Sequence, residues 1–157
     1  MILALYCPDI AQNAGTTIRT GACLGVPVHI IEPAGFPVAA AAFRRAGMDY
    51  LDAAGFVRHA SFDAFDAARR AEGRRLVLFT TTGAAAYTDF AFAPTDALLF
   101  GRESAGVPEA VHEAADARVT IPMRPGLRAL NVAVSAAMGL GEALRQTGGF
   151  PSPAPAR

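Results

Sequence analysis

A glycine followed by two charged residues ends a run of bulky apolar residues in this sequence. Residues 98–100 are Leu-Leu-Phe, and Gly101, Arg102 and Glu103 come directly after them. Because glycine carries no side chain, we expect the backbone at Gly101 to approach a ligand closely. Residues 109–114 follow a proline and begin with an acid, a pattern that predicts the start of a helix. This strand, loop and helix form the first candidate binding site.

Two further apolar runs end in loops of the same kind. Residues 76–79 run into Thr-Thr-Thr-Gly at 80–83, and residues 119–121 run into a segment rich in proline and glycine at 122–126. The carboxyl ends of parallel strands meet at one edge of a sheet, which is where open α/β sheets bind ligands. We therefore predict a binding crevice at the point where these three strands end.

Several common chemistries lack their motifs here. The sequence has no GxxxxGK[ST] phosphate loop and no GxGxxG after its first apolar run. Residues 101–106 resemble the nucleophile elbow only in part, because Arg102 stands where its first glycine should be, so a serine hydrolase stays open as an alternative. His29, His59 and His112 are far apart in sequence, and we expect no metal site.

Composition indicates one globular domain in a chain of 157 residues. No run reaches the roughly 18 apolar residues needed to span a bilayer, and the N-terminus does not resemble a signal peptide, so we expect a cytoplasmic protein without a membrane segment. Cys7 and Cys23 lack metal-type spacing, and we expect two buried free thiols. All 14 basic residues are arginine and the net charge is zero. Any surface for nucleic acid must therefore be a local patch.

Apolar runs and end signals predict alternating strands and helices. The expected strands cover residues 2–6, 28–32 and 56–59, besides the three named above. The expected helices lie between an N-cap at Asn13 and a stop at Gly25, over residues 38–45, and between an N-cap at Ser61 and Gly73. This alternation predicts an α/β fold with a mostly parallel sheet flanked by helices on both faces.

The last long element, predicted as a helix over residues 130–145, is apolar on nearly every side. Such a helix is buried on several sides, and in a chain this short we expect it to lie in a subunit interface. Residues 149–157 are rich in proline, and we expect a disordered tail there. We therefore expect a single domain over residues 1–148.

Three motifs carry a resemblance to a known family. Residues 13–19 resemble the NxGxxxR first motif of the SPOUT superfamily of trefoil-knotted RNA methyltransferases, and residues 100–108 resemble its FGxExxGxP second motif. Residues 121–123, together with Leu130 and Asn131, resemble its IPM…SLN third motif. The order and spacing hold from residue 3 to about residue 148.

Within that superfamily, three shorter segments are most similar to the 2′-O-methyltransferases of the tRNA wobble nucleotide. These are residues 6–13, 29–33 and 45–50. The resemblance implies a C-terminal trefoil knot, S-adenosylmethionine (SAM) as cofactor and a homodimer.

By position, the resemblance places cofactor contacts on five residues, mainly through backbone groups: Phe79, Gly101, Ile121, Ala129 and Leu130. One departure concerns the third motif, which usually reads SLNLSN. Residues 129–134 here read Ala-Leu-Asn-Val-Ala-Val, so we expect this motif to make no hydroxyl contact with the cofactor.

The resemblance also assigns catalytic roles. Methylation of a ribose needs help for a weakly nucleophilic hydroxyl, and the family gives that task to the arginine of the first motif, here Arg19. A guanidinium stays protonated near neutral pH, so we expect Arg19 to orient the target and stabilise negative charge rather than act as a free base. Glu103 either balances charge near the sulfonium or only holds its loop. Asn13 either serves the site or only caps its helix.

We expect the substrate to be the anticodon stem-loop of tRNA. The sequence shows no additional RNA-binding domain, so the target should be an accessible single-stranded loop. The arginines near the motif loops are the candidates for phosphate contacts: Arg44, Arg45, Arg124 and Arg128. Two alternatives stay open, namely 2′-O-methylation of another RNA nucleotide and a cofactor-binding RNA-binding module that transfers no methyl group.

Overall fold

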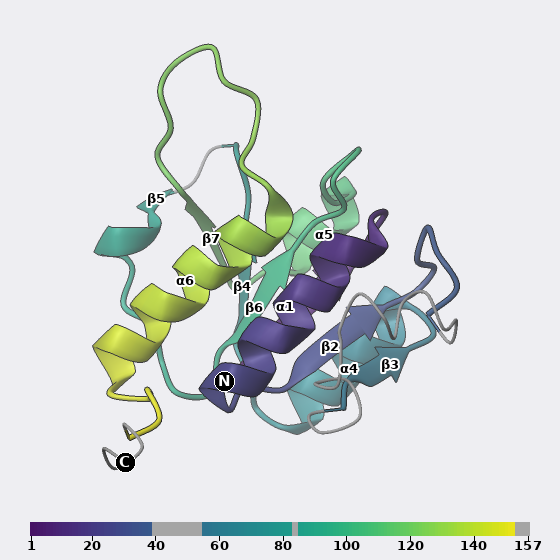
Figure 1. Ribbon diagram of the computed structural model, residues 1–157, viewed down its shortest axis with the longest axis horizontal. Coiled ribbons are helices and arrows are strands. Elements are labelled where there is room, and N and C mark those ends of the chain that lie inside the picture. The colour runs from purple at the N-terminus through teal and green to yellow at the C-terminus, as the bar shows by residue number, and fades with distance from the viewer. Residues whose placement is uncertain (39–54, 83–84, 153–157) are drawn as a thin grey trace, which may run out of the picture.

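The computed structural model describes residues 1–38, 55–82 and 85–152, which form a seven-stranded sheet in which every neighbouring pair of strands is parallel (Figure 1). The strand order is β3-β2-β1-β6-β4-β7-β5. The strands are β1 Ile2–Tyr6, β2 Val28–Ile31, β3 Val57–His59, β4 Leu76–Phe79, β5 Ala85–Ala86, β6 Ala97–Phe100 and β7 Ala117–Thr120. The predicted parallel α/β sheet is confirmed.

The central strands are continuous apolar runs because helices cover both of their faces. β6 lies between β1 and β4, and all four of its residues are buried. Phe100 is in register with Leu5 of β1 and with Phe79 of β4. The carboxyl ends of these three strands therefore stop at nearly the same level, which sets up one edge for a site.

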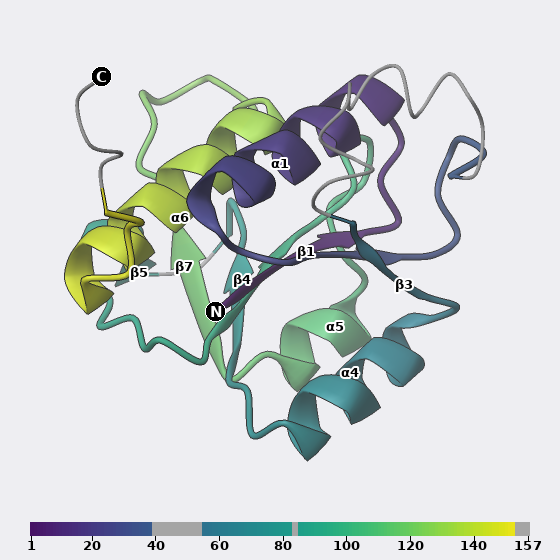
Figure 2. The same ribbon diagram turned by 60° about the horizontal axis from the view of Figure 1, so that its bottom comes forward.

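Among the described residues, two helices lie on each face of the sheet. α1 (Ala11–Leu24) and α6 (Val132–Thr147) lie side by side on one face. Figure 2 shows α4 (Phe62–Ala71) and α5 (Glu109–Ala114) on the opposite face. Ile18 and Leu140 are fully buried in the first layer, and Phe65 is buried in the second.

Ends of helices mostly follow the expected signals, with one correction. Gly25 ends α1 at φ +69°, and the Ser61 hydroxyl accepts a hydrogen bond from the Ala64 N–H at the start of α4. The prediction of Asn13 as N-cap is wrong, because α1 begins at Ala11 and its N-cap is Ile10. Asn13 lies inside the first turn, where its amide is free to bond with other loops.

α6 begins two residues later than predicted because Asn131 is its N-cap. The Asn131 Oδ1 accepts hydrogen bonds from the N–H groups of Ala133 at 2.9 Å and Val134 at 3.3 Å. Leu130 therefore precedes the helix. The outward side of α6 leaves Val134 49% and Met138 37% exposed, so an apolar face is uncovered in the single chain.

Several expectations fall outside the description or differ from it. The predicted helix over residues 38–45 and most of the Pro-rich tail lie outside the described residues. Cys7 is buried as expected, but Cys23 is exposed on α1. Residues Tyr87–Asp89 form a short 3-10 helix that no periodic pattern announced.

The amino ends of the strands are held by ion pairs in which one partner is buried. Arg75 precedes β4 and donates to the two carboxylate oxygens of Asp96 at 2.9 and 2.8 Å, and Asp96 is fully buried before β6. Arg69 on α4 is 3% exposed and donates to Asp116 Oδ2 at 2.7 Å. Asp116 precedes β7 and also accepts the Leu76 N–H. These contacts tie the starts of β4, β6 and β7 together.

Candidate active site

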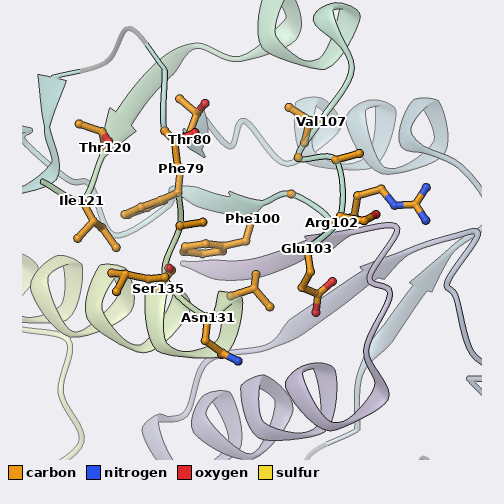
Figure 3. A pocket seen from close by; sticks show the side chains of 18 of the residues that line it. Phe79, Thr80, Phe100, Arg102, Glu103, Val107, Thr120, Ile121, Asn131 and Ser135 are labelled. Atoms are coloured by element: carbon orange, nitrogen blue, oxygen red, sulfur yellow. The ribbon is translucent and has the colours of Figure 1, made fainter. Parts of the chain in front are cut away.

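A pocket of about 640 Å³ lies at the carboxyl ends of β4, β6 and β7, where the sequence predicted a crevice. This volume is within the range of small-molecule sites. Residues from all three motif segments line the pocket (Figure 3). The five predicted cofactor contacts, Phe79, Gly101, Ile121, Ala129 and Leu130, are all among its lining residues, as are Asn13 and Glu103.

Three arginines predicted to meet the RNA fall within the described residues, and they lie outside the pocket lining. Arg19 is exposed on α1, six residues beyond Asn13, and Arg124 and Arg128 are exposed between β7 and α6. Arg44 and Arg45 lie outside the described residues. The site residues therefore divide into a pocket group and an exposed basic group.

Aromatic rings form one wall of the pocket. Phe79 and Phe100 stack with ring centroids 4.6 Å apart, and both are almost fully buried (Figure 3). α6 approaches this wall closely, because a Cβ at Gly139 would lie 2.5 Å from the Phe79 ring. An apolar wall of this kind can pack against a flat heterocycle such as a purine.

The loop after β6 folds back on itself so tightly that it requires glycine at two positions. A Cβ at Gly101 would lie 2.7 Å from the Gly106 carbonyl carbon. Arg102 and Gly106 exchange two backbone hydrogen bonds, of 3.0 and 2.8 Å, and Gly106 has φ +65°. Gly101 lines the pocket, as the sequence predicts, and the space left by its missing side chain is filled by Gly106.

Three side chains from the three motifs form one hydrogen-bonded chain. The Asn13 amide nitrogen donates to Glu103 Oε1 at 2.9 Å, and the Asn131 amide nitrogen donates to Asn13 Oδ1 at 2.9 Å. Glu103 Oε2 also accepts the Asp9 N–H at 2.9 Å. This network joins the start of α1, the loop after β6 and the start of α6, which gives Asn13 a role other than capping.

A second set of hydrogen bonds joins the loop after β1 to the loop after β6, and the sequence did not indicate it. Arg102 Nε donates to both carboxylate oxygens of Asp9, at 3.1 and 3.3 Å, and its terminal nitrogen bonds to the same group. The Ser104 N–H donates to Asp9 Oδ2 at 3.1 Å, and the Ser104 hydroxyl also donates there. The hydrogen bonds from Arg102 and Ser104 hold the pKa of Asp9 well below its usual range.

The pocket contains hydroxyl groups although the third motif lacks its usual serines. Thr80, Thr120 and Ser135 all line it, and Ser135 lies one turn into α6 (Figure 3). Residues 129–134 contain no hydroxyl, as the sequence showed, but Ser135 directly after them brings one to the pocket. His112 on α5 also lines the pocket.

Two histidines that are 30 residues apart in sequence meet on β2 and β3. His29 Nδ1 and His59 Nε2 are 2.9 Å apart, and Phe65 packs edge-on against both rings. Burial, with the neighbouring His59 as the second cause, lowers the pKa of His29 to about 4. Among the described residues, no group of three or more His, Cys, Asp or Glu side chains could hold a metal ion.

The pocket fits SAM by its chemistry. Its volume suits a nucleoside with an amino acid attached, the Phe79–Phe100 wall suits an adenine ring, and the Glu103 carboxylate offers negative charge to a sulfonium. Backbone groups of the loops after β4, β6 and β7 also line the cavity. These features are those of small-molecule sites, which combine apolar walls with a few placed polar groups.

Comparisons with known proteins agree with this site. Residues 1–141 match the SpoU rRNA Methylase family. A tRNA (cytidine(34)-2'-O)-methyltransferase from Ancylobacter novellus is 71% identical over 150 residues, which cover 96% of this chain and 95% of that protein.

Solved structures give the same result. A structure described as giving insights into the 2-OH methylation of C/U34 on tRNA superposes with a TM-score of 0.86 at 42% identity, covering 92% of this chain and 93% of the other. The SpoU methyltransferase AviRb from Streptomyces viridochromogenes, in complex with AdoMet, superposes with a TM-score of 0.83 at 30% identity, covering 93% of this chain and 60% of the other. None of the helices in the described residues is long and apolar enough to cross a membrane.

Proposed function

The chain belongs to the SpoU rRNA methylase family, and on that premise we propose that it methylates the ribose 2′-hydroxyl of the tRNA wobble nucleotide, using SAM. The acceptor is cytidine or a modified uridine in the anticodon loop. The observation that carries the proposal is the pocket lined by all three motif segments and joined by Glu103, Asn13 and Asn131. The activity named for the Ancylobacter novellus relative supports the choice of nucleotide.

The residues around the pocket divide the work of holding the cofactor. SAM supplies an electrophilic methyl group on a positively charged sulfur. The aromatic wall of Phe79 and Phe100 would pack against its purine, and the loop backbones at Gly101, Ile121 and Leu130 would bond its polar groups. Glu103 would face the positive charge. Ser135, just beyond the third motif, would offer the cofactor a hydroxyl.

Arg19 would bind the substrate rather than the cofactor. It is exposed on α1 and does not line the pocket, so it can meet a phosphate or a ribose that enters from outside. A guanidinium keeps its proton near neutral pH and offers a fork of donors suited to phosphate. Arg19 would therefore orient the 2′-hydroxyl toward the methyl group and stabilise the negative charge that develops on its oxygen.

Exposed arginines would supply the contacts to the RNA backbone. Arg124 and Arg128 lie in the loop that leads into the pocket segment, and Arg44 and Arg45 are the further candidates. Each phosphate contact releases counterions, so binding should weaken steeply as salt is raised. Because the net charge of the chain is zero, RNA binding would depend on such local contacts and not on the charge of the whole protein.

We also propose that the chain works as a homodimer through α6 and α1. The support is the uncovered apolar face formed by Val134 and Met138 on α6. Two further exposed apolar residues lie just before these helices: Leu130, 39% exposed, precedes α6, and Ile10, 41% exposed, precedes α1. Sedimentation at micromolar concentration should give about twice 16.3 kDa. Met138→Glu should shift the chain toward the monomer, and a wild-type monomer with full activity would refute the proposal.

Other features implied by the resemblance remain proposals. These are the trefoil knot in the C-terminal half, the single domain over residues 1–148 with a disordered tail, and a cytoplasmic location, which the proposed tRNA substrate supports.

The proposed reaction is tested in cells and in vitro. Mass spectrometry of wobble nucleosides should show loss of 2′-O-methylation when the gene is deleted. Purified protein should transfer tritiated methyl groups to anticodon stem-loop transcripts, and should fail on transcripts in which only the wobble ribose is 2′-deoxy. Equal methylation of both transcripts would refute the proposed acceptor. Binding of SAM and RNA without any transfer would favour the binding module.

A further inference from the structure

The carboxylate of Asp9 is the hub of the loop that follows β1. It accepts hydrogen bonds from the Arg102 guanidinium, from the Ser104 N–H and from the Ser104 hydroxyl. Arg102 and Ser104 are the two neighbours of Glu103 in the chain. The Asp9 carboxylate therefore holds the residue on each side of Glu103, while the Glu103 carboxylate bonds to the Asp9 backbone N–H and to Asn13.

The contacts between the two loops are reciprocal. While the Asp9 side chain holds the neighbours of Glu103, the Glu103 carboxylate accepts the Asp9 N–H and the Asn13 amide, both at 2.9 Å. In Figure 3, Arg102 points away from the Phe79–Phe100 wall, and the Glu103 side chain turns toward the start of α6. The Arg102 guanidinium is thus directed to the Asp9 carboxylate, and the neighbouring Glu103 carboxylate is directed to Asn13.

The backbone around Asp9 is itself held in place. Cys7, two residues earlier, has φ +44°, which a residue with a side chain rarely adopts. The Gly35 N–H donates to the Pro8 carbonyl at 2.8 Å, and a Cβ at Gly35 would lie 3.1 Å from the Asp9 Cα. The turn that presents Asp9 is therefore fixed on its other side by a close backbone contact.

The charges matter because the cofactor is a cation at its reacting atom. Arg102 and Glu103 both line the pocket, and both hydrogen bonds described for Glu103 come from neutral N–H groups. An unpaired guanidinium at Arg102 could bond to Glu103 or stay in the pocket, and either would oppose a sulfonium. Asp9 gives Arg102 another partner and is itself ionised at neutral pH.

We propose that Asp9 is a positioning residue of the active site: by holding Arg102 it keeps the guanidinium off Glu103, so that the Glu103 carboxylate stays available to the sulfonium of SAM. The proposal rests on the proposed function, because it assigns the charge of that cofactor to this pocket. It assigns Asp9 no contact with the cofactor or the RNA. Asp9 therefore acts through Arg102 and Glu103.

The test compares two ligands that differ in charge at sulfur. SAM carries a sulfonium, whereas S-adenosylhomocysteine (SAH) carries a neutral thioether at the same place. Calorimetry on the full chain should show that Asp9→Asn weakens SAM about tenfold and SAH less than threefold, because only SAM loses an electrostatic partner near a partly exposed site. Asp9→Glu, which keeps the charge, should retain the wild-type ratio of the two affinities.

Removing Arg102 as well should cancel the effect. In the double variant Asp9→Asn/Arg102→Met no guanidinium is released, so the ratio of SAM to SAH affinity should return to within about threefold of wild type. The matched control is Glu32→Gln, which removes a carboxylate from another arginine, Arg58, outside the pocket lining and should leave the ratio unchanged.

The outcomes separate this proposal from the proposed function. If Asp9→Asn weakened both ligands equally, or if the double variant did not recover the ratio, Asp9 would only be shaping the loop and the proposal would be refuted. If the wild-type chain bound neither ligand, the methyltransferase assignment would fall first and this proposal with it. A selective loss of SAM affinity that Arg102→Met reverses would support the role of Asp9.

Discussion

The two edges of the sheet both carry arginines beside carboxylates, and they differ in what those carboxylates are bonded to. At the amino edge the fully buried Asp96 is bonded to Arg75 through both oxygens, and Asp116 is bonded to the buried Arg69. At the carboxyl edge Asp9 is likewise bonded to Arg102, but Glu103 beside it accepts its described hydrogen bonds from the neutral Asp9 N–H and the Asn13 amide.

This difference separates stability from function. A buried carboxylate that is paired with a guanidinium has its charge neutralised and serves to join strands. Removing the guanidinium would leave an uncompensated buried charge, which is destabilising. A carboxylate that is held only by neutral donors keeps its charge for a ligand. The same residue types therefore support the fold at one edge and, in our proposal, the reaction at the other.

The largest effect should be the loss of methyl transfer when Arg19, the exposed arginine of the first motif, is replaced. Arg19→Ala should lower the rate of methyl transfer by roughly a hundredfold to a thousandfold, the loss typical of removing a donor that stabilises developing negative charge. SAM affinity should stay unchanged, because Arg19 does not line the pocket. Single-turnover methyl transfer and calorimetry measure the two quantities.

The control for Arg19 is Arg70→Ala, an exposed arginine on α4 that is paired with Asp66. This variant should retain full activity. If Arg19→Ala transferred methyl groups at the wild-type rate, the catalytic assignment of the first motif would be wrong.

At the structural edge, Arg75→Met should lower the free energy of unfolding by roughly 3 kcal/mol, because it leaves the buried Asp96 carboxylate without its counter-charge. Urea denaturation measures this loss. SAM affinity of the folded fraction should be unchanged. A loss of stability below about 1 kcal/mol, or a selective loss of SAM affinity, would break the division between the two edges.

Gly101→Val tests whether the shape of the functional loop matters as much as its charges. A side chain at this position would collide with Gly106 and open the loop, so SAM affinity should fall at least about tenfold. Circular dichroism and denaturation would show that the rest of the fold is intact. Wild-type affinity in a folded variant would refute the assignment of this loop to the pocket.

Lowering the pH should reduce the stability of the fold by a smaller amount, through the histidine pair on β2 and β3 and not through either edge. The pKa of His29 is about 4 in the folded chain, below the ordinary value of 6.5, because of burial and then the nearby His59. The unfolded chain therefore binds more protons between these values, and stability falls as the pH is lowered from 6.5 to 4. We expect a loss of about 1 kcal/mol, since the pair is only half-buried.

His29→Gln should flatten this part of the stability profile. The hydrogen bonds from Arg102 lower the pKa of Asp9, so its contribution is lost only as the pH falls below the usual aspartate range, near 4. An unchanged profile in His29→Gln would assign the loss to the edges instead.

The sequence predicted every described strand except β5, and the position of the pocket, because their signals are local. The runs at β4 and β6 are continuous and apolar, and each ends in turn residues, so the edge where they meet could be inferred. The SPOUT resemblance added the cofactor and the pocket residues, which the structure gathers in one cavity.

The failures involve residues whose partners are distant in the chain. Asn13 has a side chain suited to N-caps, and nothing local indicates that Glu103 and Asn131 would engage it instead. The contact between Asp9 and Arg102 spans 93 residues, so only the parallel register of β1 and β6 brings the two loops together. Ser135 was missed because it lies just beyond the motif whose serines are absent.

The pairing of β1 with β6 has a consequence for how the chain emerges from the ribosome. Ile2 lies opposite Ala97, so the first strand to be made cannot complete its central pairing until about 95 further residues have been added. At typical rates of synthesis this takes roughly 5 to 20 seconds. During that interval β1 can pair with β2, whose Val28 lies opposite Leu3, but its other side is an open, apolar strand edge. Until β6 is made, that unpaired edge of β1 is a site where another chain could pair.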